Sequence, residues 1–238
     1  VTLIVLGLLV LIAIAGQGSL IHAVSIAGKS SGQLNLAKLM QKGKMHLKPL
    51  FAVNFIKVLF IGVLLYLTRW MVSAVAGSDS GFAATLLVIA SVVILFLGLT
   101  VSFLTIYSAC FIMLEEKSFK QAVSGSWKLF LGHWLVSLEM AVVVFLVGLL
   151  VAIVGIGGLM AIATPAFLLL AIGAISGSSA LAGVGLVASL IAAALWLLVV
   201  GSVYTTFAVS AWTILFIQMK ERGLSSKMKA WVRRLIKR

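Results

Sequence analysis

The sequence predicts an all-α integral membrane protein. We expect a bundle of five long transmembrane helices plus one short re-entrant or partly inserted helix, with amphipathic interfacial helices on the cytoplasmic side. Composition is the first reason, because the 238 residues are 63% hydrophobic and only 10% charged, with a mean hydropathy of +1.28. A water-soluble domain of this length could not cover its surface with so few polar groups. The other reasons are the length of the apolar runs and the clustering of Lys and Arg between them.

Apolar runs divide the chain, and five of them reach the ~20 residues that a helix needs to cross the hydrocarbon core. These five runs lie at about 2–27, 49–75, 82–113, 134–154 and 184–219. A sixth run, "LMAIATPAFLLLAIGAI" at 159–175, is shorter and has Pro165 near its middle. Because all six runs are continuously apolar and do not alternate with period two, they are not strands of a membrane barrel.

The cations predict the topology. All but two of the 18 Lys and Arg residues lie at 29–48, 115–133 and 220–238. The positive-inside rule places these segments in the cytoplasm, and it places 76–81 and 155–183, which hold no cation, outside. We therefore expect a multi-pass protein of the cell inner (cytoplasmic) membrane with a cytoplasmic C-terminus. The net charge of +13 then reflects topology and anionic lipid, not nucleic acid.

The short run decides where the basic tail lies. If all six runs crossed, the C-terminal cations would lie outside, against the charge rule. We therefore expect 159–175, flanked by "GIGG" and "SGSSALAG", to enter the membrane without crossing it. The alternative is a short sixth span with the tail outside.

The chain is expected to form one helical transmembrane domain, 1–219, followed by a basic amphipathic tail, 220–238. Aligning Ala37 with Ala122 and Lys48 with His133 suggests a weak internal repeat, about 34–113 and 119–219. Each copy would contain an amphipathic segment, a span, an outer turn and a second span.

Three segments have the pattern of helices lying in the interface. In "KSFKQAVSGSWKLFLGHW", apolar residues recur at helical spacing: Phe119, Val123, Trp127, Phe130 and Trp134. The tail repeats the pattern with Leu224, Met228, Trp231 and Leu235, and the first segment has Leu36, Met40 and Leu47. We predict anionic-lipid contacts from the cations of these segments: Lys42, Lys44, Lys120, Lys128, Lys227, Arg233 and Arg234. We predict interfacial anchors at Trp127, Trp134, Arg69, Trp70 and Trp231.

Few polar residues fall inside the apolar runs, and we select Glu139, Lys57, Asn54 and His22 as intramembrane candidates. A charged side chain at the bilayer centre costs ~2.5–3.5 kcal/mol on insertion scales. One interpretation pairs Glu139 with Lys57, or makes Glu139 a proton or cation site. The other is that both reach water or headgroups by snorkelling. For His22, between Ser19 and Ser25, an interhelical hydrogen bond is the expected use.

No motif in the sequence indicates catalysis. The three histidines show no metal-ligand spacing, Cys110 is the single cysteine, and no Ser-His-Asp set or carboxylate pair occurs. We expect no enzymatic activity, no cofactor and no metal site.

The segment "IMLEEKSFKQAVSGSWKLFLGHW" resembles a pattern in a bacterial polytopic membrane family: an acidic residue after a span, then Ser, Ala, a Ser-Trp pair and a basic-aromatic lead into the next span. "WTILFIQMKERG" is similar to the family's last-span ending, with Phe216 in the usual Tyr place and Met219 for Leu. The family is the membrane domain found beside glycerophosphodiester phosphodiesterases, with its stand-alone YciC-like relatives. The resemblance implies one further N-terminal span and two cytoplasmic ends. It implies no phosphodiesterase activity, because that catalytic domain is not in this sequence.

Two functions follow from these patterns. The first is a non-enzymatic membrane protein whose basic amphipathic helices engage the cytoplasmic leaflet, organising lipid or docking a partner. A protein partner or a second copy is compatible with it. The second is a transporter or channel for a small solute or lipid, suggested by the repeat, by Glu139 within a span and by the proline-broken run.

Overall fold

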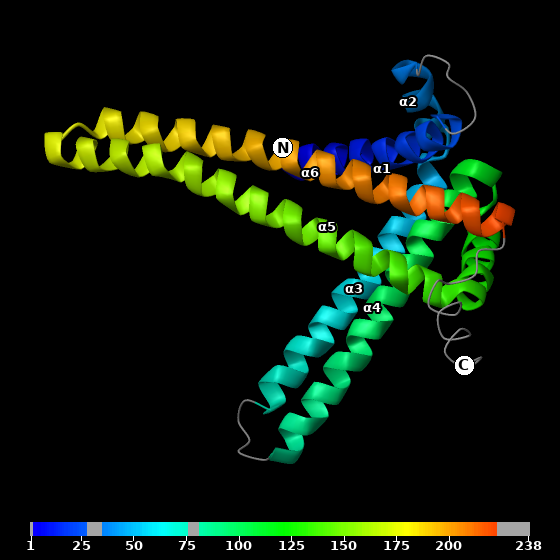
Figure 1. Ribbon diagram of the computed structural model, residues 1–238. Coiled ribbons are helices and arrows are strands. Elements are labelled where there is room, and N and C mark those ends of the chain that lie inside the picture. Colours follow the sequence, from blue (N-terminus) through cyan, green and yellow to red (C-terminus); the bar gives the residue numbers. More distant parts are fainter. Residues whose placement is uncertain (1, 28–34, 76–80, 223–238) are drawn as a thin grey trace, which may run out of the picture. The chain divides into compact units, whose positions relative to one another are not determined.

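The computed structural model describes residues 2–27, 35–75 and 81–222, and this part of the chain is entirely helical (Figure 1). Its helices are α1 (Thr2–Ala27), α2 (Leu36–Met45), α3 (Leu47–Val75), α4 (Gly81–Glu115), α5 (Phe119–Ser176) and α6 (Ser179–Arg222). All except α2 are long and apolar enough to cross a membrane. The predicted all-α fold with five membrane-spanning helices is confirmed at this level.

The chain forms two compact units. The first unit contains Val1–Ser137 and Trp212–Arg238, and the second contains Leu138–Ala211. The first unit therefore combines α1 to α4 with the start of α5 and the end of α6, whereas the second is the hairpin made by the rest of α5 and α6. Residues 212–222 belong to the first unit. The predicted domain 1–219 with its tail 220–238 stays a prediction, because most of the tail lies outside the described residues.

In the first unit, α2 begins at a polar cap and lies closely against α1. The side chain of Asn35 accepts hydrogen bonds from the amides of Ala37 and Lys38, which would otherwise lack partners at the helix start. Gly43 allows the close approach, because a Cβ there would collide with the Ala15 carbonyl oxygen and the Ser19 hydroxyl of α1. This contact fixes the basic helix α2 at the C-terminal half of α1.

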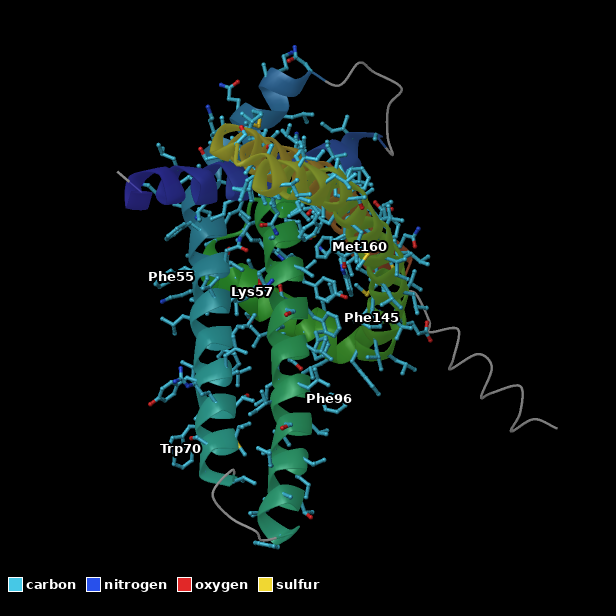
Figure 2. All side chains as sticks on the ribbon, turned by 90° about the vertical axis from the view of Figure 1, so that its left-hand side faces the viewer. Phe55, Lys57, Trp70, Phe96, Phe145 and Met160 are labelled. Carbon is cyan, nitrogen blue, oxygen red and sulfur yellow. The ribbon has the colours of Figure 1, made fainter. Side chains whose placement is uncertain are left out.

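Helices α3 and α4 form an antiparallel hairpin in the first unit, and most of its surface is apolar and exposed (Figure 2). Leu64 is buried against Gly98, whereas Phe55, Trp70 and Phe96 are 55%, 62% and 60% exposed. In water such a surface would be unstable, but lipid tails are as apolar as these side chains. The exposure therefore supports a membrane location for the hairpin.

Helix α5 contains one break, at His133, whose backbone angles are φ −133° and ψ 27°. A similar break lies at His46, between α2 and α3, with φ −103° and ψ 17°. In both places the ring Nδ1 lies 3.3 Å from the carbonyl oxygen four residues earlier, that of Lys42 or Leu129. The proposed internal repeat stays a prediction, but each predicted copy does begin with a helical segment that ends at a histidine.

The prediction that 159–175 forms a helix of its own is wrong, because α5 continues through it without a break. Its partial insertion into the membrane stays a prediction. Two of the three glycines of "GIGG", Gly155 and Gly158, serve contacts between helices, and none of the three ends the helix. A Cβ on Gly158 would collide with the Trp196 ring of α6, whose Nε1 donates a 3.0 Å hydrogen bond to the Gly155 carbonyl. Gly148 faces Tyr204 in the same way. In a membrane, small residues of this kind let helices approach closely.

Pro165 lies within α5 and does not end it. Proline removes the backbone donor that would serve the Ala161 carbonyl, and transmembrane helices tolerate such a loss. The adjacent Thr164 hydroxyl donates to the Met160 carbonyl oxygen at 2.9 Å. Gly177, with φ +66°, then forms the turn to α6, a conformation that glycine adopts without strain.

The second unit is long for a membrane hairpin. From Leu138 to Ser176, α5 extends about 58 Å at 1.5 Å per residue, whereas the hydrocarbon core is ~30 Å thick. Its surface stays apolar to the tip, where Phe167 and Ile175 are 70% and 89% exposed. Keeping this surface in lipid requires a strong tilt or a local deformation of the bilayer.

Candidate functional site

The structure brings the three predicted basic segments together at one end of the first unit. Glu115, the last residue of α4, forms ion pairs with Lys117, at 2.9 Å, and with Lys220 of α6. Glu116 forms an ion pair with Lys42 of α2. We call these five residues the basic cluster. The cluster joins α2, the end of α4, the α4–α5 connection and α6.

The Phe111 ring packs against two lysines of the basic cluster. Phe111 is 3% exposed, and its centroid lies 4.3 Å from the Lys117 ammonium and 5.3 Å from that of Lys220. Each such cation–π contact contributes about 0.5–1 kcal/mol at a partly exposed site. The ring also meets Phe216 edge-on, with centroids 4.8 Å apart. Phe111 thus connects the charged end to the apolar interior.

Helices α4 and α6 pack in parallel through residues spaced by four. Tyr107 contacts Trp212, Phe111 contacts Phe216, and Glu115 pairs with Lys220. Phe103 extends the same face and contacts Trp212 at a centroid distance of 5.4 Å. This aromatic column was not predicted from the sequence, although the four-residue spacing of aromatics on both helices was the available signal.

Buried hydroxyl groups join the helices beneath the column. Tyr107 and Ser137 share a 2.6 Å hydrogen bond, and Ser108 and Ser126 share one of 3.0 Å. A further side-chain hydrogen bond links Cys110 to Thr213. Within the described residues, no buried side-chain nitrogen or oxygen lacks a partner. These groups therefore act as interhelical contacts, which average ~0.6 kcal/mol each in membranes.

The start of α5 packs on α4 through small residues as well as through part of the predicted apolar stripe. Ala122 and Ser126 are fully buried, and a Cβ on Gly125 would lie 3.2 Å from the Phe111 ring. Trp127 and Trp134, from the predicted stripe, are 47% and 52% exposed. Their exposure leaves them available to the interface or to lipid, and their role as anchors stays a prediction.

Of the four intramembrane candidates, three lie in the first unit and one lies in the second. Asn54 donates a 3.3 Å hydrogen bond to the Gln17 side chain of α1 and a 2.9 Å bond to the Leu50 carbonyl. His22 is half-buried on α1, and its carbonyl accepts from Ser25. Glu139 is half-buried and belongs to the second unit. The pairing of Glu139 with Lys57 stays a prediction.

Lys57 lies beside a groove of about 180 Å³ between α3, α4 and the start of α5. Figure 2 shows Lys57 on the side of α3 that faces α4, whereas Phe55 and Trp70 lie on the other side. A larger apolar groove of about 340 Å³ lies in the second unit, beside Leu159 and Phe167. Both grooves offer apolar surface, as an acyl chain would require.

The predicted lipid-contacting lysines divide into two sets. Lys42 is neutralised by Glu116, whereas Lys44, Lys120 and Lys128 are exposed and form no ion pair with a described carboxylate. Arg69 is also exposed, near the far end of α3. The remaining predicted contacts and one anchor lie outside the described residues: Lys227, Trp231, Arg233 and Arg234.

The described residues show no constellation for metal binding, since no three His, Cys, Asp or Glu side chains gather. Comparisons of the chain with protein-family models, with curated proteins and with solved structures found no match. The resemblance to the phosphodiesterase-associated membrane family is therefore not tested by them.

The ion pair of Glu116 with Lys42 predicts a pH dependence. The Lys42 ammonium donates a hydrogen bond and lies beside the carboxylate, and both effects hold the pKa of Glu116 below its usual value. The pair therefore stabilises the fold above the pKa of the unfolded chain, and the contribution disappears as pH falls through the lower, folded pKa. We expect a Lys42→Gln/Glu116→Gln double-mutant cycle in mixed micelles to show coupling at neutral pH and none at strongly acidic pH.

The matched control is a second double-mutant cycle that uses Lys44→Gln in place of Lys42→Gln. Lys44 forms no ion pair with a described carboxylate. Its cycle with Glu116→Gln should show no coupling at either pH. A Lys42–Glu116 coupling that persisted unchanged in acid would contradict the assignment.

Proposed function

We propose that the protein is a non-enzymatic, multi-pass membrane protein whose basic end binds the anionic headgroups of the cytoplasmic leaflet, organising lipid or docking a partner there. One observation carries the proposal: α2, the α4–α5 connection and the end of α6 are distant in sequence but meet in the basic cluster. Cations collected at one end of apolar helices match the charge asymmetry of membrane proteins.

The charge balance at this end favours an anionic surface. The two glutamates of the basic cluster form ion pairs with Lys42, Lys117 and Lys220. Lys44, Lys48, Lys120 and Lys128 are exposed and unpaired among the described residues, so their charge is available to lipid. Each cation near an anionic leaflet contributes ~1 kcal/mol of attraction.

The helix order supports a cytoplasmic C-terminus. Helix α4 ends, α5 begins and α6 ends at the basic cluster, while α3 and α4, and α5 and α6, connect at their other ends. If the basic end is cytoplasmic, five crossings leave the C-terminus in the cytoplasm. We extend this proposal to the inner membrane of a bacterium and to the phosphodiesterase-associated family, on the strength of "EEKSFKQAVSGSW".

A transporter of an amphiphilic solute is the second candidate, and the Lys57 groove favours it. Transport of a hydrophilic solute is less well supported, because the two grooves described above are lined mainly by apolar side chains. A hydrated solute would need polar partners along its path.

The test measures which lipids surround the whole protein in mixed phosphatidylglycerol and phosphatidylcholine bilayers. We expect wild type to enrich phosphatidylglycerol in its lipid shell, and the triple variant K44Q/K120Q/K128Q to lose most of this enrichment. Arg69→Gln, at the other end of α3, is the matched control and should leave it unchanged. Cysteines introduced at 44 and 120 should both react from the cytoplasmic side. The proposal would be refuted if wild type and the triple variant enriched phosphatidylglycerol equally. It would also be refuted if the two introduced cysteines reacted from opposite sides of the membrane.

A further inference from the structure

We propose that the groove beside Lys57 is a binding site for one anionic phospholipid, held with its phosphate on the Lys57 ammonium and an acyl chain along the groove. The inference deepens the proposed function and rests on it for the presence of anionic lipid. It concerns a single retained molecule, however, and not the lipid shell around the basic end.

The groove is built by three helices of the first unit. Val53 and Phe60 of α3 lie one turn before and after Lys57, Leu104 and Thr105 of α4 form the facing wall, and Phe119 of α5 also contributes. Val53 and Thr105 are each 5% exposed, so the floor is buried, whereas the other walls are partly open. A groove with a buried floor and an open side fits a flexible chain that enters from the bilayer.

Lys57 is the unsatisfied polar group of this groove. The Thr105 hydroxyl donates to the Val101 carbonyl at 2.9 Å, and Ser108 bonds Ser126, so the hydroxyls already have partners. Lys57 forms no ion pair or hydrogen bond within the part of the chain that the structure describes. A cation inside a span is costly unless an anion or water reaches it. A phosphate group supplies the missing charge.

The position of Lys57 suits a headgroup that remains connected to the interface. It lies nine residues after Lys48, about 13 Å along α3, and its long stem can direct the ammonium toward the basic end. The groove below it continues along Phe60 and Val101. A phospholipid therefore satisfies the cation and covers the apolar wall at once, which a soluble anion would not do.

Native mass spectrometry of the whole protein, purified with equal amounts of phosphatidylglycerol and phosphatidylcholine, tests the site. We expect one phosphatidylglycerol per chain to survive delipidation that removes phosphatidylcholine. Lys57→Gln should weaken its retention about five-fold, as loss of ~1 kcal/mol of headgroup attraction implies. Arg69→Gln removes one positive charge of α3 outside the groove and should retain the lipid.

A second pair of variants tests the groove without changing charge. Ile56→Trp fills a lining position and should displace the lipid, whereas Val58→Trp adds the same bulk at a position that is 69% exposed and outside the groove. Thermal unfolding in micelles confirms that all four variants fold. Equal retention of both lipids, retention unaffected by Lys57→Gln, or replacement of the phospholipid by added oleate would each overturn the proposal.

The two proposals fail separately. K44Q/K120Q/K128Q should reduce the enriched lipid shell and keep the retained lipid, while Lys57→Gln should do the reverse. If the triple variant has no effect but Lys57→Gln does, the basic-end proposal fails and the groove site stands.

Discussion

Replacing Gly158 by alanine is expected to lower the free energy of unfolding by about 2–3 kcal/mol, the usual range for overpacking a close contact. A Cβ at this position would overlap the indole of Trp196. The ring cannot simply turn away, because its Nε1 donates to the Gly155 carbonyl at 3.0 Å. The helices α5 and α6 must therefore separate or the hydrogen bond must break. Denaturant-driven unfolding in mixed micelles measures the loss.

Gly157→Ala is the matched control for this change. It is the same substitution one residue earlier, and a Cβ there would meet nothing within 4 Å. Because alanine restricts the unfolded chain more than glycine, this variant should be neutral or more stable by about 0.5–1 kcal/mol. Equal effects of the two substitutions would show that Trp196 does not pack against Gly158.

Phe111→Ala is expected to destabilise the first unit by about 3 kcal/mol, at the lower end of the range for buried phenylalanine. The substitution removes the edge-on contact with Phe216, the packing against Gly125 and the ring beneath the two cluster ammoniums. A cavity would remain, since Phe111 is only 3% exposed. Unfolding in mixed micelles should show the loss, and Phe111→Leu should recover part of it.

The control for Phe111 lies on the same helix. Phe96 is 60% exposed on α4 and points away from the hairpin in Figure 2. A side chain that faces lipid in the folded protein also faces lipid when the helices separate, so it contributes little to the free energy of unfolding. Phe96→Ala should therefore change stability by less than about 1 kcal/mol. A loss as large as that of Phe111→Ala would mean that Phe96 is buried in an interface.

Local chemistry predicted the elements that depend on it. The continuous apolar runs predicted five membrane-spanning helices, and the five long helices α1, α3, α4, α5 and α6 confirm this. The grouping of cations between the runs predicted three basic segments, and their ion pairs meet at the end of α4. Hydrophobic length and charge distribution act residue by residue, so they are readable without knowledge of neighbours.

Contacts between helices decided the rest. "GIGG" and Pro165 predicted a broken segment, but Trp196 occupies the space that the glycines leave, and the helix continues. The apolar stripe of Phe119, Val123 and Trp127 predicted a helix in the membrane interface, and it did not reveal that Ala122 and Ser126 pack on α4. Inside a bilayer, lipid satisfies large apolar side chains as well as protein does, so helix packing selects small and polar residues. The amphipathic pattern of the sequence therefore determined which segments meet lipid or water, while shape complementarity between distant helices determined which faces meet each other.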